Sequence, residues 1–212
     1  EIGGVERITY STSHPINMTD DLIKLHGTNQ KLMPYLHLPV QSGSDNVLKL
    51  MNRKHTRDYY FGIIEKVRKA KPDIALSSDF IIGFPGETDQ DFEDTLDLIR
   101  RVKYMNSYSF KYSPRPGTPA ANKELINYEI LDERLERTQA LLNEQQLEYN
   151  KQFIQKTVQV LIDGAGKREG QVKGKSEFNQ SVALQGEKQI IGQIVPVQIK
   201  EALTHSLLGE RA

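Results

Sequence analysis

The chain lacks cysteine altogether, since none of its 212 residues is one. This absence excludes disulfide bonds, and it means that no thiolate of this chain can hold an iron–sulfur cluster. Long apolar runs are missing as well, because no stretch approaches the ~18 residues that a membrane-spanning helix requires. With 37% hydrophobic and 26% charged residues, the composition is ordinary for a soluble cytosolic protein that builds one large or two modest cores.

The net charge of the chain is zero, because 28 Lys and Arg balance 28 Asp and Glu. A neutral chain argues against nucleic-acid binding, yet the average hides an asymmetry. Residues 151–212 hold nine bases and six acids, a local charge of +3, which leaves 19 bases and 22 acids, a charge of −3, for residues 1–150. The modest basic excess therefore lies in the C-terminal part.

Strand and helix patterns alternate along the first 127 residues. Four segments are predicted to be strands, each followed by a helical pattern: residues 7–12, 35–40, 74–82 and 107–112. Such alternation is typical of a parallel sheet covered by helices. It predicts an α/β fold made of the later strands of a partial (β/α) barrel.

The sequence indicates three helices clearly, two within these residues and one directly after them. One begins at a capping box formed by Thr88 and Asp91. The apolar side chains predicted for its buried face are Phe92, Leu96, Ile99 and Val102. Another covers about residues 56–71 and stops before Pro72, and residues 128–153 form one long amphipathic helix that leads to the next domain.

The hydrophobic period changes to two after this helix. Candidate strands lie at residues 158–162, 171–175, 181–184 and 194–199, separated by glycine-containing turns. This pattern predicts a small five-stranded antiparallel barrel, a shape that binds oligonucleotides in many proteins.

Glycine-rich turns follow three of the predicted strands. Gly83 and Gly86 come between a buried-looking strand and the helix at Thr88, and residues 36–44 and 107–119 repeat the pattern of a strand followed by a Pro and Gly turn. The carboxyl ends of parallel strands meet at one edge of a sheet, where glycine lets the backbone approach a bound group. A ligand site is therefore expected at this edge.

With these motifs in view, the chain resembles the radical S-adenosylmethionine methylthiotransferases, most closely the MiaB-type tRNA enzymes. The matching segments are Thr12-Ser13-His14-Pro15, LHLPVQSGSDNVLKLMNRKHT at residues 36–56, SSDFIIGFPGET at 77–88 and YSFKYSPRPGTPA at 108–120. The resemblance covers essentially the whole chain. It implies that residues 1–150 are the later part of the radical SAM barrel with its closing helix, and that residues 151–212 are a TRAM domain, an RNA-binding β-barrel.

One part of the family pattern is absent. These enzymes need a C-x-x-x-C-x-x-C triad for one 4Fe-4S cluster and three more cysteines for an auxiliary cluster. The chain begins at Glu1 without an initiator Met, and residues 5–10 read as a strand already inside the barrel. We therefore expect the C-terminal part of a longer enzyme, inactive by itself. A cysteine-free relative that has lost catalysis is the alternative.

The resemblance also implies a reaction. The full-length enzyme would be a cytoplasmic monomer that adds a methylthio group to C2 of N6-isopentenyladenosine beside the anticodon. Its cofactors would be S-adenosylmethionine and two 4Fe-4S clusters, one that splits S-adenosylmethionine into a 5′-deoxyadenosyl radical and one that supplies sulfur. Its partners would be the tRNA anticodon stem-loop and the N-terminal cluster-binding domain of the same protein, with no membrane.

Candidate contacts to the polar end of S-adenosylmethionine lie at the first of these turns. Gln41, Ser42 and Ser44 place an amide and two hydroxyls around Gly43. Ser44 is equally a good N-cap for the helix that follows. Arg53 resembles the family arginine that reaches the cofactor, although a solvated surface arginine has the same sequence signal.

The second turn fits the radical SAM pattern G-x-I-x-G-x-x-E only in part. Ile81, Ile82 and Gly83 match its centre, but Asp79 replaces the first glycine and Glu87 lies one residue late. Asp79 either faces substrate or sulfonium, or accepts hydrogen bonds from neighbouring turns. The complete set predicted to bind cofactor is Gln41, Ser42, Gly43, Ser44, Arg53, Asp79, Ile82, Gly83, Glu87 and Ser113. No catalytic residue and no metal ligand is predicted in this chain.

Candidate RNA contacts fall into two groups. Cations flank one predicted hairpin of the C-terminal domain, and an aromatic residue beyond it is placed to stack a base: Lys167, Arg168, Lys173, Lys175 and Phe178. A solvated charged face is the alternative. The five histidines have no i,i+3 or i,i+4 partner, which argues against a metal site. Of these, His14 and His55 are the expected substrate contacts, and His37 should point into the barrel or meet a buried partner.

Two other functions fit the sequence. Sister methylthiotransferases act on threonylcarbamoyl-adenosine or on a ribosomal protein, although the SSDF and TSHP segments favour the isopentenyl-adenosine branch. A non-catalytic RNA-binding protein made of barrel remnant and TRAM domain belongs to a different class. A cysteine-bearing domain encoded in frame upstream would support the enzyme.

Overall fold

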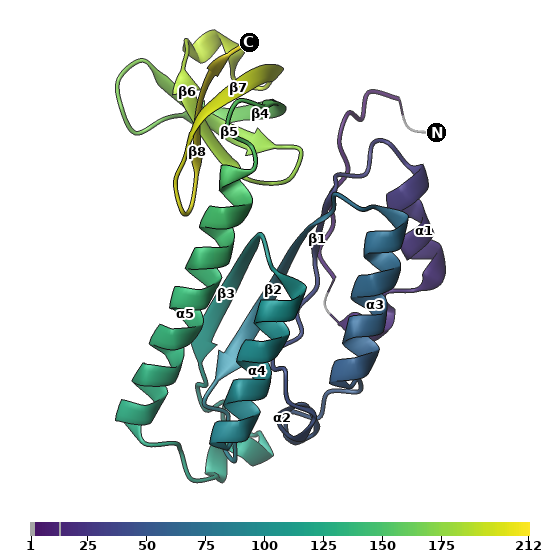
Figure 1. Cartoon of the computed structure of the whole chain (residues 1–212), viewed down its shortest axis with the longest axis vertical. Helices are drawn as coiled ribbons and strands as arrows, with labels where there is room; N and C mark the ends of the chain where they lie inside the picture. Colours follow the sequence, from purple (N-terminus) through teal and green to yellow (C-terminus); the bar gives the residue numbers. More distant parts are fainter. Residues whose placement is uncertain (1–2, 13) are drawn as a thin grey trace. The chain divides into compact units, whose positions relative to one another are not determined.

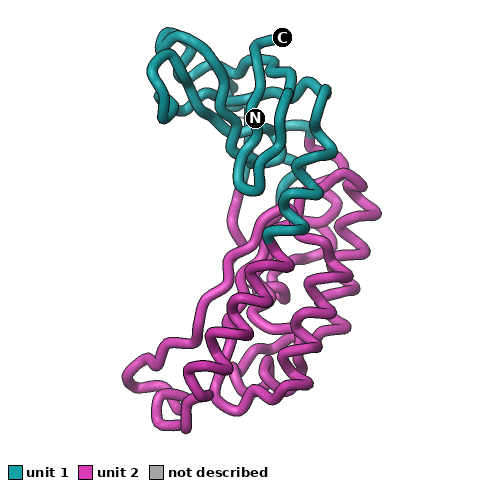
Figure 2. The backbone as a smooth tube through the Cα atoms, turned by 60° about the vertical axis from the view of Figure 1, so that its left-hand side comes forward, with its two compact units in different colours: residues 1–9, 30–35, 143–212 teal, residues 10–29, 36–142 magenta. Residues whose placement is uncertain are grey.

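The computed structural model describes residues 3–12 and 14–212, so Ser13 of the Thr12-to-Pro15 motif lies outside the described residues (Figure 1). The chain divides into two compact units (Figure 2). Unit 1 contains residues 1–9, 30–35 and 143–212, and unit 2 contains residues 10–29 and 36–142. The domain division expected near residue 150 stays a prediction.

Unit 2 is an α/β unit around a three-stranded sheet of order β1-β2-β3. Its strands are β1 (Tyr35–His37), β2 (Ala75–Ile82) and β3 (Asn106–Lys111), with β2 and β3 parallel. Its helices are α1 (Asp20–Thr28), α2 (Asp45–Leu50), α3 (Arg57–Ala70), α4 (Asp89–Val102) and the first part of α5 (Tyr128–Lys151), with two short 3-10 helices, η1 (Pro15–Asn17) and η2 (Pro119–Asn122). The predicted parallel sheet with helices between its strands is confirmed.

The prediction of a strand at residues 7–12 is wrong. Only two isolated bridges form there, one between Ile8 and Leu32 and one between Ser11 and His37. The first lies in unit 1 and the second in unit 2. Because the segment changes partner between these two residues, no continuous ladder develops.

The predicted strand at residues 35–40 is shorter than expected, because β1 ends at His37. Pro39 has no N–H to donate, and the N–H of Val40 donates to the side chain of Ser78 instead of to a backbone carbonyl. Backbone pairing with β2 resumes at Gln41, whose N–H donates to the carbonyl of Asp79 at 3.0 Å and whose carbonyl accepts from Ile81 at 2.9 Å. The chain thus still follows β2 to its carboxyl end.

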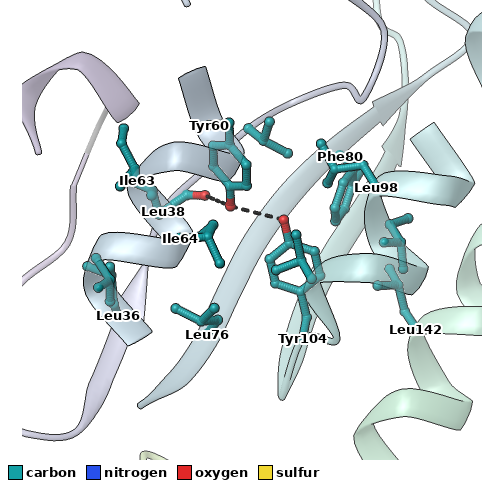
Figure 3. Packing of buried hydrophobic residues seen from close by; sticks show 14 of the residues in the cluster. Leu36, Leu38, Tyr60, Ile63, Ile64, Leu76, Phe80, Leu98, Tyr104 and Leu142 are labelled. Carbon is teal, nitrogen blue, oxygen red and sulfur yellow. Dashed lines mark hydrogen bonds between the residues drawn. The ribbon is translucent and has the colours of Figure 1, made fainter. Parts of the chain in front are cut away.

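One face of the sheet forms the core of unit 2 (Figure 3). Leu76, Phe80 and Ile82 alternate along β2 and are buried against α3 and α4. Two buried tyrosines satisfy their hydroxyls within this core: Tyr60 donates to the carbonyl of Leu38 at 3.0 Å, and its oxygen lies 2.9 Å from that of Tyr104. The apolar face predicted for α4 is confirmed, since Phe92, Leu96, Ile99 and Val102 are all buried.

Unit 1 is built on a closed barrel of order β4-β5-β6-β8-β7. Its strands are β4 (Thr157–Ala165), β5 (Gln171–Ser176), β6 (Ser181–Gln185), β7 (Ile194–Ala202) and β8 (Leu207–Arg211), with 3-10 helix η3 (Lys188–Ile190) before β7. Alternate residues such as Val158, Val160 and Ile162 fill its core. The end of α5 is joined to it by Asn150, which donates to the carbonyl of Leu203 and accepts from Gln180.

The five-stranded barrel is confirmed, but it is mixed and not purely antiparallel. β6 and β8 pair in parallel, from Val182 opposite Leu207 to Leu184 opposite Gly209, whereas the other four pairs are antiparallel. Closing the barrel places β8 between β7 and β6, so it runs antiparallel to one neighbour and parallel to the other. β8 itself was not predicted, because the charged Glu210 and Arg211 interrupt its short apolar run.

Barrel closure depends on glycine where two strands approach closely. A Cβ added to Gly174 on β5 would lie 2.1 Å from the carbonyl oxygen of Leu161 on β4, whereas one added to Gly164 meets only the side chain of Lys173 at 3.5 Å. We expect Gly174→Ala to lower the free energy of unfolding by at least about 2 kcal/mol. Gly164→Ala should cost less than about 1 kcal/mol. Urea denaturation of both variants measures this, and equal effects would contradict the close approach.

Candidate functional site

The turn between β1 and α2 is anchored to α4. Ser42 is fully buried, and its hydroxyl lies 3.2 Å from that of Thr95, which also accepts the N–H of Gly43 at 3.0 Å. A Cβ at Gly43 would lie 2.6 Å from the carbonyl oxygen of Asp94, so the turn needs glycine there. Gln41 is 8% exposed and has a positive φ of 76°.

Ser44 caps α2, accepting from the N–H of Val47 at 3.3 Å, and donates to the Asp91 carboxylate. That carboxylate also accepts from the side chain of Asn46 and from both the N–H and the hydroxyl of Thr88, which completes the predicted capping box of α4. Burial by itself raises the pKa of Asp91, but these hydrogen bonds together outweigh it and lower the pKa below its usual value. The hydroxyls of Ser42 and Ser44 thus have structural partners, and their cofactor contact stays a prediction.

The second turn, between β2 and α4, is braced from within the protein. Gly83 has a φ of +75° and donates its N–H to Glu87, whose buried carboxylate pairs with Arg134 of α5 at 2.8 Å. Burial raises the pKa of Glu87, and the Arg134 charge opposes that rise. Arg134, a residue that the sequence reading missed, also pairs with Asp89 at 2.6 Å. Glu87 therefore stabilises the turn, and Ile82 lies in the core.

Three of the predicted residues, His14, Arg53 and His55, lie close to one another. The rings of His14 and His55 meet edge to face with centroids 5.0 Å apart, and the Arg53 charge acts on both. Burial, helped by His14 and Arg53, lowers the pKa of His55 to about 4, so its imidazole is neutral at pH 7. Arg53 is half-buried, which lowers its pKa, and within the described residues its guanidinium has no ion-pair or hydrogen-bond partner. It is available for an anion.

Asp79 lies on the face of the sheet that the helices leave uncovered. We define the open face by the side chains of Asp79 and Ile81 on β2 and their parallel partners Tyr108 and Phe110 on β3, whereas Ser77, on the same side of β2, is fully buried. His37 of β1 joins this face: its Nδ1 lies 3.0 Å from the Ser77 hydroxyl and its Nε2 3.4 Å from the Asp79 carboxylate. The expected direction of His37 is confirmed.

Two aromatic residues of the open face were missed as site candidates. Tyr108 and Phe110, on the edge strand β3, are 53% and 55% exposed, which leaves two large rings in contact with solvent. The alternation in Ser107-Tyr108-Ser109-Phe110 was the available signal, since it puts both rings on one face of a strand. Ser113, predicted to bind cofactor, is exposed just beyond β3.

The cations predicted to bind RNA lie in unit 1, on the β4–β5 hairpin. Lys167 and Arg168 occupy its exposed loop, and Lys173 and Lys175 alternate on the exposed side of β5. Phe178 is half-buried with its ring packed against Phe153 at a centroid distance of 5.1 Å. Its observed role is therefore in packing, and base stacking by Phe178 stays a prediction.

Within residues 3–12 and 14–212, no cluster of three or more His, Asp and Glu is placed to share a metal ion. Among these same residues, no helix is both long and apolar enough to cross a membrane.

The Asp91 contacts predict a pH-dependent contribution to stability. Because the folded-state pKa is lowered, the contribution of the carboxylate is present above the unfolded pKa, near 3.8, and is lost as pH falls through the folded value. We expect Asp91→Asn to reduce the free energy of unfolding by about 1–3 kcal/mol at pH 7. The deficit should shrink below about pH 4. Asp21→Asn, in the exposed first turn of α1, is the control, and a deficit independent of pH would refute the assignment.

Comparison with known proteins finds two matching families. Residues 2–99 match the Radical SAM superfamily and residues 151–211 match the TRAM domain. A solved structure, described as coproporphyrinogen III oxidase from Escherichia coli, a radical SAM enzyme, covers 62% of this chain and is itself covered over 31% of its length. Its TM-score is 0.52 at 20% sequence identity, which supports the fold alone.

Curated relatives match over nearly the whole chain. Proteins named tRNA-2-methylthio-N(6)-dimethylallyladenosine synthase from Rickettsia akari (strain Hartford) and Rickettsia felis (strain ATCC VR-1525 / URRWXCal2) are each 58% identical over 99% of this chain, and one from Rickettsia bellii (strain OSU 85-389) is 57% identical. The match covers 48% of each relative, so the chain spans about half their length. The chain therefore carries part of a radical SAM domain and a TRAM domain, and over nearly its whole length it is similar to proteins named tRNA-2-methylthio-N(6)-dimethylallyladenosine synthase.

Proposed function

We propose that this chain is the C-terminal part of a cytoplasmic, monomeric enzyme that adds a methylthio group to C2 of N6-isopentenyladenosine in the tRNA anticodon stem-loop. Dimethylallyl and isopentenyl name the same five-carbon substituent. The observation that carries the proposal is the 58% identity, over 99% of the chain, to relatives named for this product. Those relatives are about twice as long, which leaves room for the cysteines that this chain lacks.

The residues at the carboxyl edge of the sheet fit part of S-adenosylmethionine. Arg53 offers a half-buried guanidinium to a carboxylate, and the amide of Gln41 stands at the same edge. Ser113 has an exposed position just beyond β3, and Gly83, whose N–H is bound by Glu87, lies at the end of β2. Ser42 and Ser44 act indirectly, because their hydrogen bonds to α4 fix the turn that carries Gln41.

Each part of the chain has a separate task in this proposal. When bound, S-adenosylmethionine and the iron–sulfur clusters supply the radical, sulfur and methyl chemistry, with the clusters on thiolates outside this chain. Unit 2 orients the cofactor and the base. Unit 1 holds tRNA through phosphate contacts from the β4–β5 hairpin, and His14 and His55 are candidate contacts to the same RNA.

The proposed activity is tested by comparing this chain with a longer form that includes a cysteine-bearing N-terminal domain. Both are reconstituted anaerobically with iron and sulfide, and 5′-deoxyadenosine and 2-methylthio product are measured by mass spectrometry. We expect both products from the longer form and neither from this chain. In that form, Arg53→Ala should weaken S-adenosylmethionine binding by about 1–3 kcal/mol, whereas the neighbouring exposed Lys54→Ala should not. Product from this chain alone, or none from the longer form, would refute the proposal.

Phosphate binding by unit 1 predicts a defined salt dependence. If Lys167, Arg168, Lys173 and Lys175 contribute up to four phosphate contacts, the log–log slope of affinity against salt should be about −2 to −3, at about −0.7 per contact for single strands. Lys173→Glu with Lys175→Glu should weaken binding to different RNA sequences alike, because phosphate contacts carry no base information. Lys188→Glu, outside the hairpin, is the control. Titration of the chain with tRNA at two or more salt concentrations measures this, and salt-insensitive binding would contradict it.

A further inference from the structure

On the open face an apolar pair of side chains, Ile81 and Phe110, lies beside a polar pair, Asp79 and Tyr108. Phe110 lies opposite Ile81 in the register of β2 and β3, and Tyr108 lies opposite Asp79. Side chains at such paired positions are neighbours on one face of a sheet, close enough for one planar group to touch both. The two rings are more than half exposed, whereas Phe80 and Ile82 on the other face are completely buried.

Asp79 is the acid of the open face, and its side chain is 28% exposed. The four residues of the open face include no Lys or Arg, and His37 of β1 lies 3.4 Å from the Asp79 carboxylate. Lys111, the next residue of β3, is engaged elsewhere, since its ammonium pairs with Asp132 and lies 4.1 Å from the centre of the Tyr128 ring. A ligand of the open face therefore meets carbon surface and a hydrogen-bond acceptor, and no cation of β2 or β3.

We propose that the open face is the pocket wall for the modified base and selects its prenyl group: Phe110 and Ile81 contact the dimethylallyl chain, Tyr108 packs on the adenine, and Asp79 accepts the N6–H. This inference rests on the proposed function and deepens it by naming the group that distinguishes the substrate. An N6-prenylated adenine has the matching pattern, a five-carbon apolar chain attached to an N–H donor.

The same face disfavours the other candidate base. The threonylcarbamoyl group carries a carboxylate, which would lie beside Asp79 with no Lys or Arg among the four residues of the open face to pair with it, while the nearby His37 already faces Asp79. Like charges in a partly desolvated site repel, and the apolar pair offers no hydrogen bonds to its polar atoms. The open face thus supplies both the attraction and the repulsion that specificity needs.

His37 has a positioning role in this arrangement. It bridges Ser77 and Asp79, with its two ring nitrogens 3.0 and 3.4 Å from their oxygens. Fixed between these residues, the imidazole holds the carboxylate of Asp79 in place and occupies one side of it. The other side is left for a donor from a ligand.

The test titrates the chain at low salt with three fluorescent anticodon stem-loops that differ only in the target base: adenosine, N6-isopentenyladenosine or N6-threonylcarbamoyl-adenosine. We expect the prenylated stem-loop to bind about tenfold more tightly than the unmodified one, from partial burial of five carbons. The threonylcarbamoyl form should bind no better than unmodified RNA.

Variants assign these differences to the open face. Phe110→Ala should abolish the prenyl preference and leave the affinity for unmodified RNA within about twofold. Asp79→Asn, of equal size, should raise the relative affinity of the threonylcarbamoyl form. Tyr59→Ala removes a ring of similar exposure, 46%, from α3, and it should leave all three affinities unchanged.

Several results would overturn the proposal. The wild-type chain could bind the three stem-loops alike, or not bind them at all at low salt. Phe110→Ala could lower the affinity for S-adenosylmethionine instead, which would assign the rings to the cofactor. It could also lower the melting temperature and weaken all RNAs equally, which would mean that the rings pack against protein. Failure of methylthiolation in the longer form with intact prenyl selectivity here would instead refute the proposed function alone.

Discussion

The constraint on which unit 2 depends is that its helices cover only one face of a parallel sheet. Parallel sheets usually bury both faces, and strands such as β2 then read as continuous apolar runs. In β2, Leu76, Phe80 and Ile82 are buried on the side of α3 and α4, while Asp79 and Ile81 on the other side are only partly buried. Among the described residues, Tyr108 and Phe110 on the second face therefore stay more than half exposed, while Asp79 is partly exposed beside His37.

The carboxyl edge of this sheet is fixed by hydrogen bonds and one buried ion pair. Asp91 collects donors from α2 and from the cap of α4, Thr95 holds the Ser42–Gly43 turn, and Arg134 neutralises Glu87 beneath Gly83. Removing one partner of such a buried pair is costly, because the remaining charge has no water to solvate it. These contacts thus hold the backbone of the two turns in set positions.

The constraint on unit 1 is a different one, because an open sheet of five short strands would leave two edges unpaired. Pairing of β6 with β8 and of β7 with β4 closes the barrel. The core is then filled by alternate residues of each strand, which leaves the intervening positions, Lys173 and Lys175 among them, exposed. A basic surface on a closed barrel can contact phosphate without disturbing its fold.

The sequence determined the local features. Period-two and period-3.6 patterns specified the strands and helices, the Thr88–Asp91 capping box marked the start of α4, and the motifs from residue 36 to residue 120 indicated the family. Those features depend on neighbouring residues and could be read from spacing alone. The tertiary structure decided which polar groups are free. In the folded chain Ser42 and Ser44 contact α4, and Glu87 pairs with Arg134 of α5. Arg53 has no protein partner among the described residues, and His37 lies beside Asp79. It also placed β8 parallel to β6 and put Tyr108 and Phe110 on an uncovered face. These outcomes depend on pairing between residues far apart in the chain, because a hydroxyl, carboxylate or ring looks the same in sequence whether packing covers it or leaves it exposed.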